Sequence, residues 1–254
     1  MLKTRKRFGQ HFLHDPAVLK RIVDAVAPAR GNAIVEIGPG EGALTRPLLE
    51  RVDRLTAIEI DRDLARRLGE EFPADRLAVI CADALDYDFS VLPPGFRIVG
   101  NLPYNISTPL LFHLARYADR VRDMHFMLQR EVVERMVARH STPDYGRLSV
   151  MLQTRFIMKK LFNVAPGAFR PPPKVESAVV RLVPIPGASV PEAFAGIVRK
   201  AFSARRKTLR NALGLSPGDF IALGLDPNLR PENLSPADYL RIAQLEPRSG
   251  PGTS

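Results

Sequence analysis

The sequence predicts an α/β protein, in which a mostly parallel sheet with helices on both faces is followed by a small all-α domain. Two observations support this fold class. Short apolar runs rich in β-branched residues alternate with helix-compatible stretches early in the chain, as in βαβ units. A proline-rich segment at residues 184–191 then separates this pattern from short helical patterns interrupted by glycine and proline.

The first four strands are predicted from apolar runs of strand length that end at polar or turn-forming residues. Because helical patterns separate the first three runs, we expect parallel strands that are buried on both faces. The expected strands are residues 33–37, 55–60, 77–81 and 96–100, and the helices between the first three are residues 43–51 and 62–70.

The alternation ends after a fifth strand. Residues 108–117 are an expected helix, residues 124–128 the fifth strand and residues 130–138 another helix. Residues 148–162 and 175–183 then have the pattern of two long strands without a helix between them. They predict an antiparallel hairpin at the end of the sheet, which would make it seven-stranded and mixed.

These patterns divide the chain into two domains. The sheet domain is expected at residues 1–185 and includes a basic N-terminal arm at residues 1–15. The helical domain is expected at residues 190–246, and residues 247–254 are expected to be a flexible tail.

The composition is typical of a globular protein of a reducing compartment. The chain has 254 residues, 45% of them hydrophobic, which is enough for a sizeable core. The single cysteine, Cys81, excludes an internal disulfide framework. No apolar stretch is long enough to cross a bilayer, and the basic N-terminus lacks the apolar region of a signal peptide. We therefore expect a cytoplasmic protein.

The net charge of +10 is concentrated at the two ends of the chain. Residues 1–30 carry a net charge of +5 and residues 199–254 carry +4, whereas residues 31–198 carry only +1. This distribution suits a polyanion bound across a nearly neutral body and favours a nucleic acid as partner. The alternative is ordinary solubility charge.

A glycine-rich loop follows the first strand and indicates a nucleoside pocket. It contains Gly38 and Gly40 in the run Gly-x-Gly-x-Gly, which differs from the Gly-x-Gly-x-x-Gly of dinucleotide-binding loops. Alone, it is a weak signal, and a structural turn is the alternative. Glu59 at the end of the second strand is placed to accept hydrogen bonds from ribose hydroxyls, and Asp83 after the third strand from an adenine amino group. Since no phosphate-binding lysine is evident, S-adenosylmethionine fits better than NAD.

The run Asn101-Leu102-Pro103-Tyr104 directly follows the fourth strand and looks like a clamp for adenine. The carboxyl ends of strands are where ligands bind in open α/β sheets. The Asn101 amide oxygen and the Leu102 carbonyl can each accept a hydrogen from the exocyclic amine. Pro103 stiffens the backbone, and the Tyr104 ring can stack on the base.

A basic run near the C-terminus is expected to contact RNA phosphates, together with Arg5, Lys6 and Arg7 of the N-terminal arm. With Phe202 and Leu209, its cations could form a basic helix face, and binding through it should weaken steeply with salt. The alternative is an exposed, solvated helix. The cations of the run are Arg199, Lys200, Arg205, Arg206, Lys207 and Arg210.

No metal site is expected from the sequence. His11 and His14 lie three residues apart, but no cysteine or acid completes a ligand set. The other histidines are scattered along the chain.

Seven motifs in order make the chain resemble the ribosomal RNA adenine N6,N6-dimethyltransferase family that modifies the small ribosomal subunit (KsgA type). Any one motif could mislead, but the ordered set is highly specific. The motifs are Phe8-Gly-Gln-His-Phe-Leu13, Glu36-Ile-Gly-Pro-Gly40, Asp83-Ala84, Asn101-Leu-Pro-Tyr-Asn-Ile-Ser-Thr108, His125-Phe-Met-Leu-Gln-Arg-Glu131, Phe169-Arg-Pro-Pro-Pro-Lys-Val175 and Phe202-Ser-Ala-Arg-Arg-Lys-Thr-Leu-Arg-Asn211.

The resemblance implies a Rossmann-like class I S-adenosylmethionine-dependent methyltransferase without a metal. It implies that His11, Leu13 and Ala84 join Gly38, Gly40, Glu59, Asp83 and Asn101 around the cofactor. The family more often has Asn where His11 stands, so a side-chain contact there would be altered, whereas a backbone contact would survive. Phe169 is implied as a second ring that stacks on the opposite face of the base.

The activity implied is dimethylation of N6 on two adjacent adenosines in a hairpin loop near the 3′ end of small-subunit (16S) ribosomal RNA, within ribosome biogenesis. The partner would be a small subunit or its precursor, and the enzyme a monomer. The main alternative is a related methyltransferase of large-subunit RNA that confers antibiotic resistance. A non-catalytic assembly or transcription factor on the same fold is less favoured, because Asn101 and Tyr104 are intact. A DNA adenine methyltransferase is also less favoured, because the C-terminal domain is short.

Overall fold

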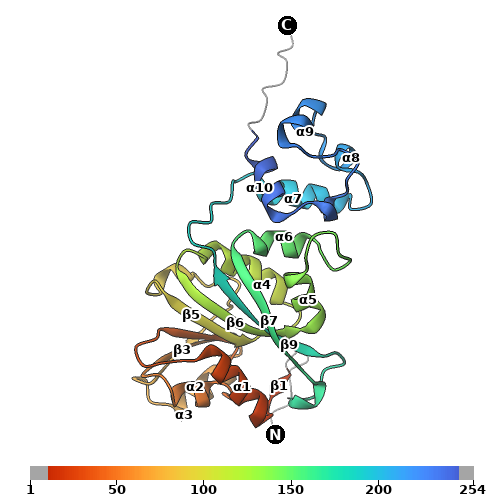
Figure 1. Cartoon of the computed structure of the whole chain (residues 1–254). Helices are drawn as coiled ribbons and strands as arrows, with labels where there is room; N and C mark the ends of the chain where they lie inside the picture. The colour runs from red at the N-terminus through yellow and green to blue at the C-terminus, as the bar shows by residue number, and fades with distance from the viewer. Residues whose placement is uncertain (1–10, 246–254) are drawn as a thin grey trace. The chain divides into compact units, whose positions relative to one another are not determined.

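The computed structural model describes residues 11–245, which form two compact units (Figure 1). Within the described chain, the first unit comprises residues 11–137 and 156–186, and the second comprises residues 138–155 and 187–245. The chain therefore passes between the units three times.

This division differs from the expected boundary in one segment. Residues 138–155 belong with the helical unit, whereas the sequence placed them in the sheet domain. The reason is packing, because Tyr145 and Val150 are fully buried in the core of the helical unit.

The first unit is built on a seven-stranded mixed sheet with the strand order β4-β3-β2-β5-β6-β9-β7. Adjacent strands from β4 to β6 pair in parallel, and β9 pairs antiparallel with both β6 and β7. The sheet and the helical second unit confirm the predicted fold class. The strands are β2 (Ile34–Ile37), β3 (Leu55–Glu59), β4 (Leu77–Cys81), β5 (Phe96–Asn101), β6 (Val121–Gln129), β7 (Phe156–Val164) and β9 (Ser177–Pro184).

The strand order reverses between β2 and β5. From β2 the chain continues outward to β3 and β4, whereas β5 lies on the other side of β2 and leads to β6. Such a reversal opens a crevice at the carboxyl ends of the two strands, which is the ligand position in doubly wound sheets. A small second sheet joins β1 (Phe12–Leu13) to β8 (Phe169–Arg170), with Leu13 opposite Phe169.

Five helices of the first unit accompany the sheet. Two of them begin with an aspartate whose side chain accepts backbone N–H groups of the first turn, namely Asp15 and Asp61. In α3, Leu64, Ala65 and Leu68 form the buried stripe of an amphipathic helix. The helices are α1 (Pro16–Val26), α2 (Thr45–Leu49), α3 (Arg62–Glu71), α4 (Ser107–Leu114) and α5 (Arg130–Val137).

The prediction of one long strand at residues 148–162 is wrong. Its first part is the helix α6 (Arg147–Gln153), and only the second part is a strand, β7. Leu148, Val150 and Leu152 are all buried. A short run that is buried on most sides has neither a clear strand period nor a clear helix period, so the pattern could not separate the two.

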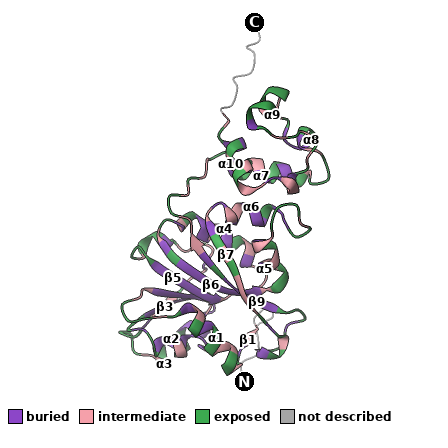
Figure 2. Cartoon of the chain, in the orientation of Figure 1, coloured by how far each residue is buried: buried purple, intermediate pink, exposed green. Residues whose placement is uncertain are grey.

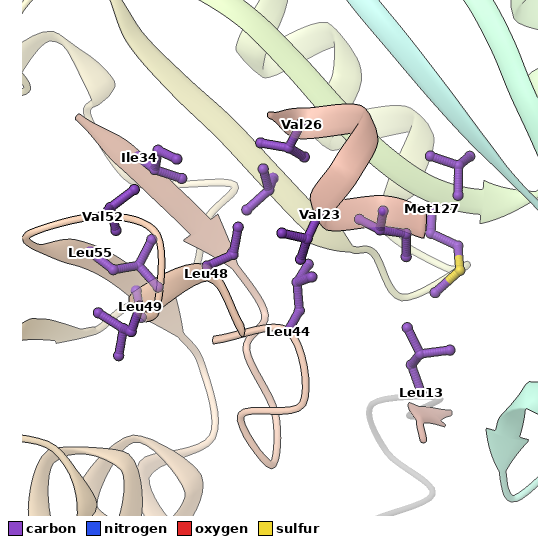
Figure 3. Close-up of a cluster of buried hydrophobic side chains, with 14 of the residues drawn as sticks. Leu13, Val23, Val26, Ile34, Leu44, Leu48, Leu49, Val52, Leu55 and Met127 are labelled. Carbon is purple, nitrogen blue, oxygen red and sulfur yellow. The ribbon is translucent and has the colours of Figure 1, made fainter. Parts of the chain in front are cut away.

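A large apolar cluster fills the space between α1, α2 and the sheet (Figure 3). Val23 and Val26 of α1, Leu48 and Leu49 of α2 and Ile34 of β2 all belong to it, and Leu48 points toward Val23. This cluster fixes α1 and the loop after β2, and both of these elements border the crevice. Figure 2 shows that β6, which lies between β5 and β9, is buried along almost its whole length.

A buried ion pair ties the end of α1 to the sheet. The Arg97 guanidinium on β5 donates to the Asp123 carboxylate on β6 through Nε (2.7 Å) and Nη2 (3.0 Å). It also donates to the carbonyls of Val26 and Ala27, which lack partners within the helix. Burial alone would raise the pKa of Asp123, but the hydrogen bonds and charge of Arg97 hold it below its usual value.

The second unit packs short helices around its own core. The Tyr145 and Tyr239 hydroxyls donate to backbone carbonyls of the segment that precedes α10, at 2.9 and 2.8 Å. Two helices start with Ser-Pro-x-Asp boxes, in which Ser216 and Ser235 cap the first turn. The helices are α6, α7 (Phe194–Ser203), α8 (Leu209–Leu213), α9 (Pro217–Leu223) and α10 (Pro236–Ala243).

Candidate active site

A pocket of the first unit lies at the carboxyl ends of β2, β3, β4 and β5, where the strand order reverses. All the residues expected at the cofactor line it, and so do all four residues of the adenine clamp. These lining residues are His11, Leu13, Gly38, Gly40, Glu59, Asp83, Ala84, Asn101, Leu102, Pro103 and Tyr104.

The glycine loop is attached to the end of β3 through Glu59. The Gly40 N–H donates to Glu59 Oε2 (3.0 Å), and the Asp61 N–H donates to Oε1 (2.9 Å). Gly38 and Gly40 have φ angles of +67° and +57°, a region that favours glycine. Burial raises the pKa of the Glu59 carboxyl, while its backbone hydrogen bonds oppose the rise. Each carboxylate oxygen keeps a second lone pair that can accept a ligand hydroxyl.

Asp83 also lines the pocket and stands just after β4, the strand next to β3. Its Oδ1 accepts the Leu85 N–H at 2.9 Å, which fixes the side chain. The Ala82 N–H donates to the Glu59 carbonyl, so the ends of β3 and β4 are held together. Asp83 and Glu59 thus present two carboxylates to one pocket.

Asn101 is oriented by a hydrogen bond to the N-terminal part of the chain. Its Nδ2 donates to the His11 carbonyl at 3.0 Å. Because a carbonyl can only accept, this bond determines which end of the amide is nitrogen. The Asn101 amide oxygen is therefore the end that can accept a hydrogen from a base. The Leu102 N–H donates to the Met127 carbonyl, which holds the following residue against β6.

His11 contacts the clamp through both its backbone and its ring. Its carbonyl accepts from Asn101, and its Nδ1 donates to the Pro171 carbonyl at 2.7 Å. The His11 and Tyr104 ring centroids lie 5.7 Å apart with a tilt of 31°. The backbone contact does not depend on the His11 side chain, whereas the contact with Pro171 does.

Tyr104 is half-buried and held at two points. Its hydroxyl and the Ser177 Oγ are 2.7 Å apart, and its carbonyl accepts from Ser107 Oγ at 3.1 Å. Burial raises the pKa of the Tyr104 phenol, and the Ser177 hydrogen bond opposes this rise.

Phe169 does not line the pocket. It is 2% exposed and belongs to the apolar cluster of the first unit, beside Leu13. Of the five residues expected at the base, the structure thus brings four together and leaves the ring of Phe169 in the core.

Sequence reasoning gave no role to Glu36, although it stands in the glycine motif. The side chain lines the pocket, and its Oε2 accepts from Thr45 Oγ1 at 2.7 Å. Burial raises the pKa of Glu36 to about 7, with a smaller contribution from nearby Glu59. The sequence signal that could have identified Glu36 is its position as an acid within an apolar run that predicts a buried strand. Ser177 was also missed, because it is separated from Tyr104 by 73 residues.

The C-terminal basic run does not form one helix face. Arg199 and Lys200 lie on α7, Arg210 lies on α8, and the other three cations lie in the turn between these helices. Leu209 is fully buried, and the Phe202 ring contacts two tyrosine rings of the core.

Two cations of the run have partners within the unit. Lys200 Nζ donates to the Leu213 carbonyl at 2.6 Å, and Arg205 pairs with Glu232 at 2.7 Å. Arg199, Arg206, Lys207 and Arg210 are exposed. Arg5, Lys6 and Arg7 lie outside the described residues.

Over residues 11–245, no group of three or more histidine, cysteine, aspartate or glutamate side chains is arranged to hold a metal ion. None of the helices in this range has the length and apolar character needed to span a membrane.

The sequence profile described as "Ribosomal RNA adenine dimethylase" matches residues 1–246. The chain belongs to the ribosomal RNA adenine dimethylase family. This membership confirms the resemblance seen in the seven motifs, and it covers both units of the fold.

Curated relatives of the dimethylase family are similar over almost the whole chain. A protein of Thiobacillus denitrificans is 60% identical over 95% of this chain and 97% of its own length. A protein of Aromatoleum aromaticum is 57% identical over 94% of this chain and 93% of its own length. Both are named "Ribosomal RNA small subunit methyltransferase A".

Solved structures support the same fold for this chain. A dimethyladenosine transferase from Plasmodium falciparum has a TM-score of 0.77 at 27% identity and covers 91% of this chain and 96% of its own. The 23S rRNA methyltransferase ErmE has a TM-score of 0.71 at 27% identity, and the match covers 91% of this chain and 98% of the ErmE chain. The expected Rossmann-like class I methyltransferase fold is thereby confirmed.

Proposed function

We propose that the protein transfers methyl groups from S-adenosylmethionine to N6 of two adjacent adenosines in a hairpin loop near the 3′ end of small-subunit (16S) ribosomal RNA, as a step of ribosome biogenesis. The observation that carries this proposal is the clamp at Asn101 and Tyr104, which lines the pocket and whose amide oxygen is not used by the contact with His11. The small subunit is favoured by relatives at 55–60% identity that carry its name.

The pocket fits a nucleoside cofactor without phosphate. Glu59 and Asp83 would accept hydrogen bonds from the ribose hydroxyls and the adenine amine, as the order of the strand ends suggests. No lysine or arginine is among the described residues that line the pocket, so a pyrophosphate would find no cation there. His11, Leu13 and Ala84 would complete the contacts.

The target base would lie against the clamp. We expect Asn101 Oδ1 and the Leu102 carbonyl to accept the two N6 hydrogens, and Tyr104 to stack on the ring. Pro103 would keep these groups in place. Stacking of Phe169 on the second face requires that residues 165–175 first move its ring out of the core.

When bound, the cofactor supplies a methyl group on a positively charged sulfur, whose bond to carbon breaks as the new carbon–nitrogen bond forms. Asn101 and Leu102 would direct the N6 lone pair at this methyl group, which is a positioning effect. The N6 proton would then leave to water. No metal is invoked, so activity is expected to persist in EDTA.

RNA would be held by cations outside the pocket. We assign this role to Arg5, Lys6 and Arg7 of the N-terminal arm and to the exposed cations of the C-terminal run. Lys200 and Arg205 would contribute less, because they already have partners within the chain. We expect a monomer acting in the cytoplasm on a small subunit or its precursor.

One observation favours a second candidate, a methyltransferase of large-subunit RNA. The ErmE structure, named as a 23S rRNA methyltransferase, covers as much of this chain as the dimethyladenosine transferase does. The cofactor loop and the clamp do not distinguish the two substrates.

Labelled cofactor offered in parallel to small subunits, large subunits, naked RNA and DNA tests the proposal. We expect label in small-subunit RNA, as dimethyladenosine at two adjacent positions, and loss of label with Asn101→Ala. Label in large-subunit RNA alone would replace the first candidate with the second. Equal label with Asn101→Ala would refute the role given to the clamp.

A further inference from the structure

The tip of the Tyr104 ring is held by a residue from a distant part of the sheet. Ser177, the first residue of β9, has its Oγ 2.7 Å from the Tyr104 hydroxyl. Ser177 is fully buried and Tyr104 is half-buried, so water can reach this hydrogen bond only from the side of the tyrosine. The contact joins the antiparallel end of the sheet to the clamp.

Ser177 is itself fixed by the strands on both sides. It lies opposite Gln129 of β6 and Val164 of β7 in the ladder. A serine side chain has a single torsion between heavy atoms, so once the strand is fixed its Oγ has only three staggered positions. The sheet therefore restricts where the Tyr104 hydroxyl can meet this partner.

The other contacts of Tyr104 do not restrain the tip of its ring. Ser107 Oγ donates to the Tyr104 carbonyl and holds the backbone. The His11 and Tyr104 ring centroids lie 5.7 Å apart with a tilt of 31°, a ring-to-ring contact that lacks the direction of a hydrogen bond. Without the hydroxyl contact to Ser177, the ring can turn about its side-chain torsions while the backbone stays in place.

We propose that Ser177 is a positioning residue, which holds the Tyr104 ring in the plane needed to stack on the target adenine, and that the second methyl transfer depends on it more than the first. This inference rests on the proposed function. After one transfer N6 keeps a single hydrogen, so only one of the two acceptors at Asn101 and Leu102 can be used. The monomethylated base is then held to a greater extent by stacking.

The test compares Ser177→Ala with the wild-type protein on small subunits and separates monomethyladenosine from dimethyladenosine. A lost hydrogen bond of ordinary strength predicts that the rate of the second transfer falls roughly threefold to tenfold. The first transfer should fall less, so monomethyladenosine accumulates. Ser177→Thr, which keeps the hydroxyl, should restore the wild-type product ratio.

Tyr104→Phe removes the same hydrogen bond from its other end. Ser177→Ala in the Tyr104→Phe background should therefore add little to the effect of Tyr104→Phe alone. Ser149→Ala serves as a matched control, because Ser149 is also fully buried but lies in the second unit. We expect it to leave the product ratio unchanged. A full additional loss in the double variant would overturn the inference.

An optical titration of the tyrosines tests the contact without any methylation. Ser177→Ala should raise the pKa of the Tyr104 phenol further, since the hydrogen bond that opposes the effect of burial is gone. Subtracting the titration of Tyr104→Phe isolates this phenol. In the methylation assay, the proposed function fails if the wild-type protein labels no RNA. Only the role of Ser177 fails if the wild-type protein dimethylates RNA and Ser177→Ala gives the same product ratio.

Discussion

The orientation of the Asn101 side chain depends on one hydrogen bond. Its Nδ2 donates to the His11 carbonyl, and the amide oxygen remains for a ligand. The sequence predicted the amide oxygen as an acceptor but not the contact of Nδ2 with His11, because His11 and Asn101 are 90 residues apart. The amide is thus a directed acceptor rather than a group that can bind a base in either sense.

Asn101→Asp separates these two functions of the amide. The variant keeps acceptor oxygens but cannot donate to the His11 carbonyl, and its negative charge would lie against that oxygen. We expect methylation of small-subunit RNA to fall about tenfold or more, with a rise in KM for the cofactor because His11 also lines the cofactor pocket. Initial rates at varied cofactor concentration measure both effects. An unchanged rate with Asn101→Asp would show that the contact with His11 has no role.

Glu36 makes the stability of the protein depend on pH. Its pKa is about 7 in the folded protein against an ordinary value of 4.5, so the folded state binds one more proton between these values. The free energy of unfolding should therefore decrease as the pH rises through this range, by about 3 kcal/mol in all.

Glu36→Gln removes the ionisation and should remove this part of the pH dependence. Urea denaturation of both proteins between pH 5 and pH 8 checks it. Glu50→Gln, at an exposed glutamate after α2, is the control and should follow the wild-type protein. Parallel pH profiles for Glu36→Gln and the wild-type protein would contradict the prediction.

At the scale of elements, β5 and β2 approach so closely that a glycine is required between them. A Cβ at Gly100 would lie 2.6 Å from the Ile37 carbonyl oxygen, which is backbone and cannot turn away. Gly100→Ala should therefore reduce the free energy of unfolding by about 1–3 kcal/mol.

The matched control is Gly69→Ala in α3, where an added Cβ meets nothing within 4 Å. It should stabilise the protein by roughly 0.5–1 kcal/mol, because alanine favours a helix. Chemical denaturation of the two variants side by side measures the difference. Equal stabilities would mean that β5 moves freely away from β2.

The sequence predicted helices and strands correctly where the hydrophobic pattern was compatible with only one of the two. The parallel strands are confirmed, because buried apolar runs between turn residues leave few alternatives to a strand. It failed at residues 148–162, where Leu148, Val150 and Leu152 are all buried and no period decides between helix and strand. The burial of Phe169 could not be predicted from the sequence either, because it depends on the pairing of β8 with β1, which lies far away in the chain.

At the scale of the whole molecule, the excess positive charge should govern RNA affinity. Arg205 and Arg206 are exposed neighbours, but Arg205 is paired with Glu232, whereas Arg206 has no ion pair within residues 11–245. Arg206→Ala should lower the slope of log affinity against log salt by about 1, and Arg205→Ala by less. Filter binding of small-subunit RNA at several salt concentrations measures the slopes. Equal slopes for the two variants would contradict this distinction.

The second unit is formed by two separate segments of the chain, so its core residues are synthesised at different times. Tyr145 and Val150 leave the ribosome well before Phe194 and Tyr239, the residues with which they share a core. Until Phe194 and Tyr239 have been synthesised, the apolar side chains of α6 lack their packing partners. The residues of β7 and β9 are synthesised in this interval. A fragment starting at residue 187 would lack part of its own interior, so the C-terminal unit has to be produced with residues 138–155 attached.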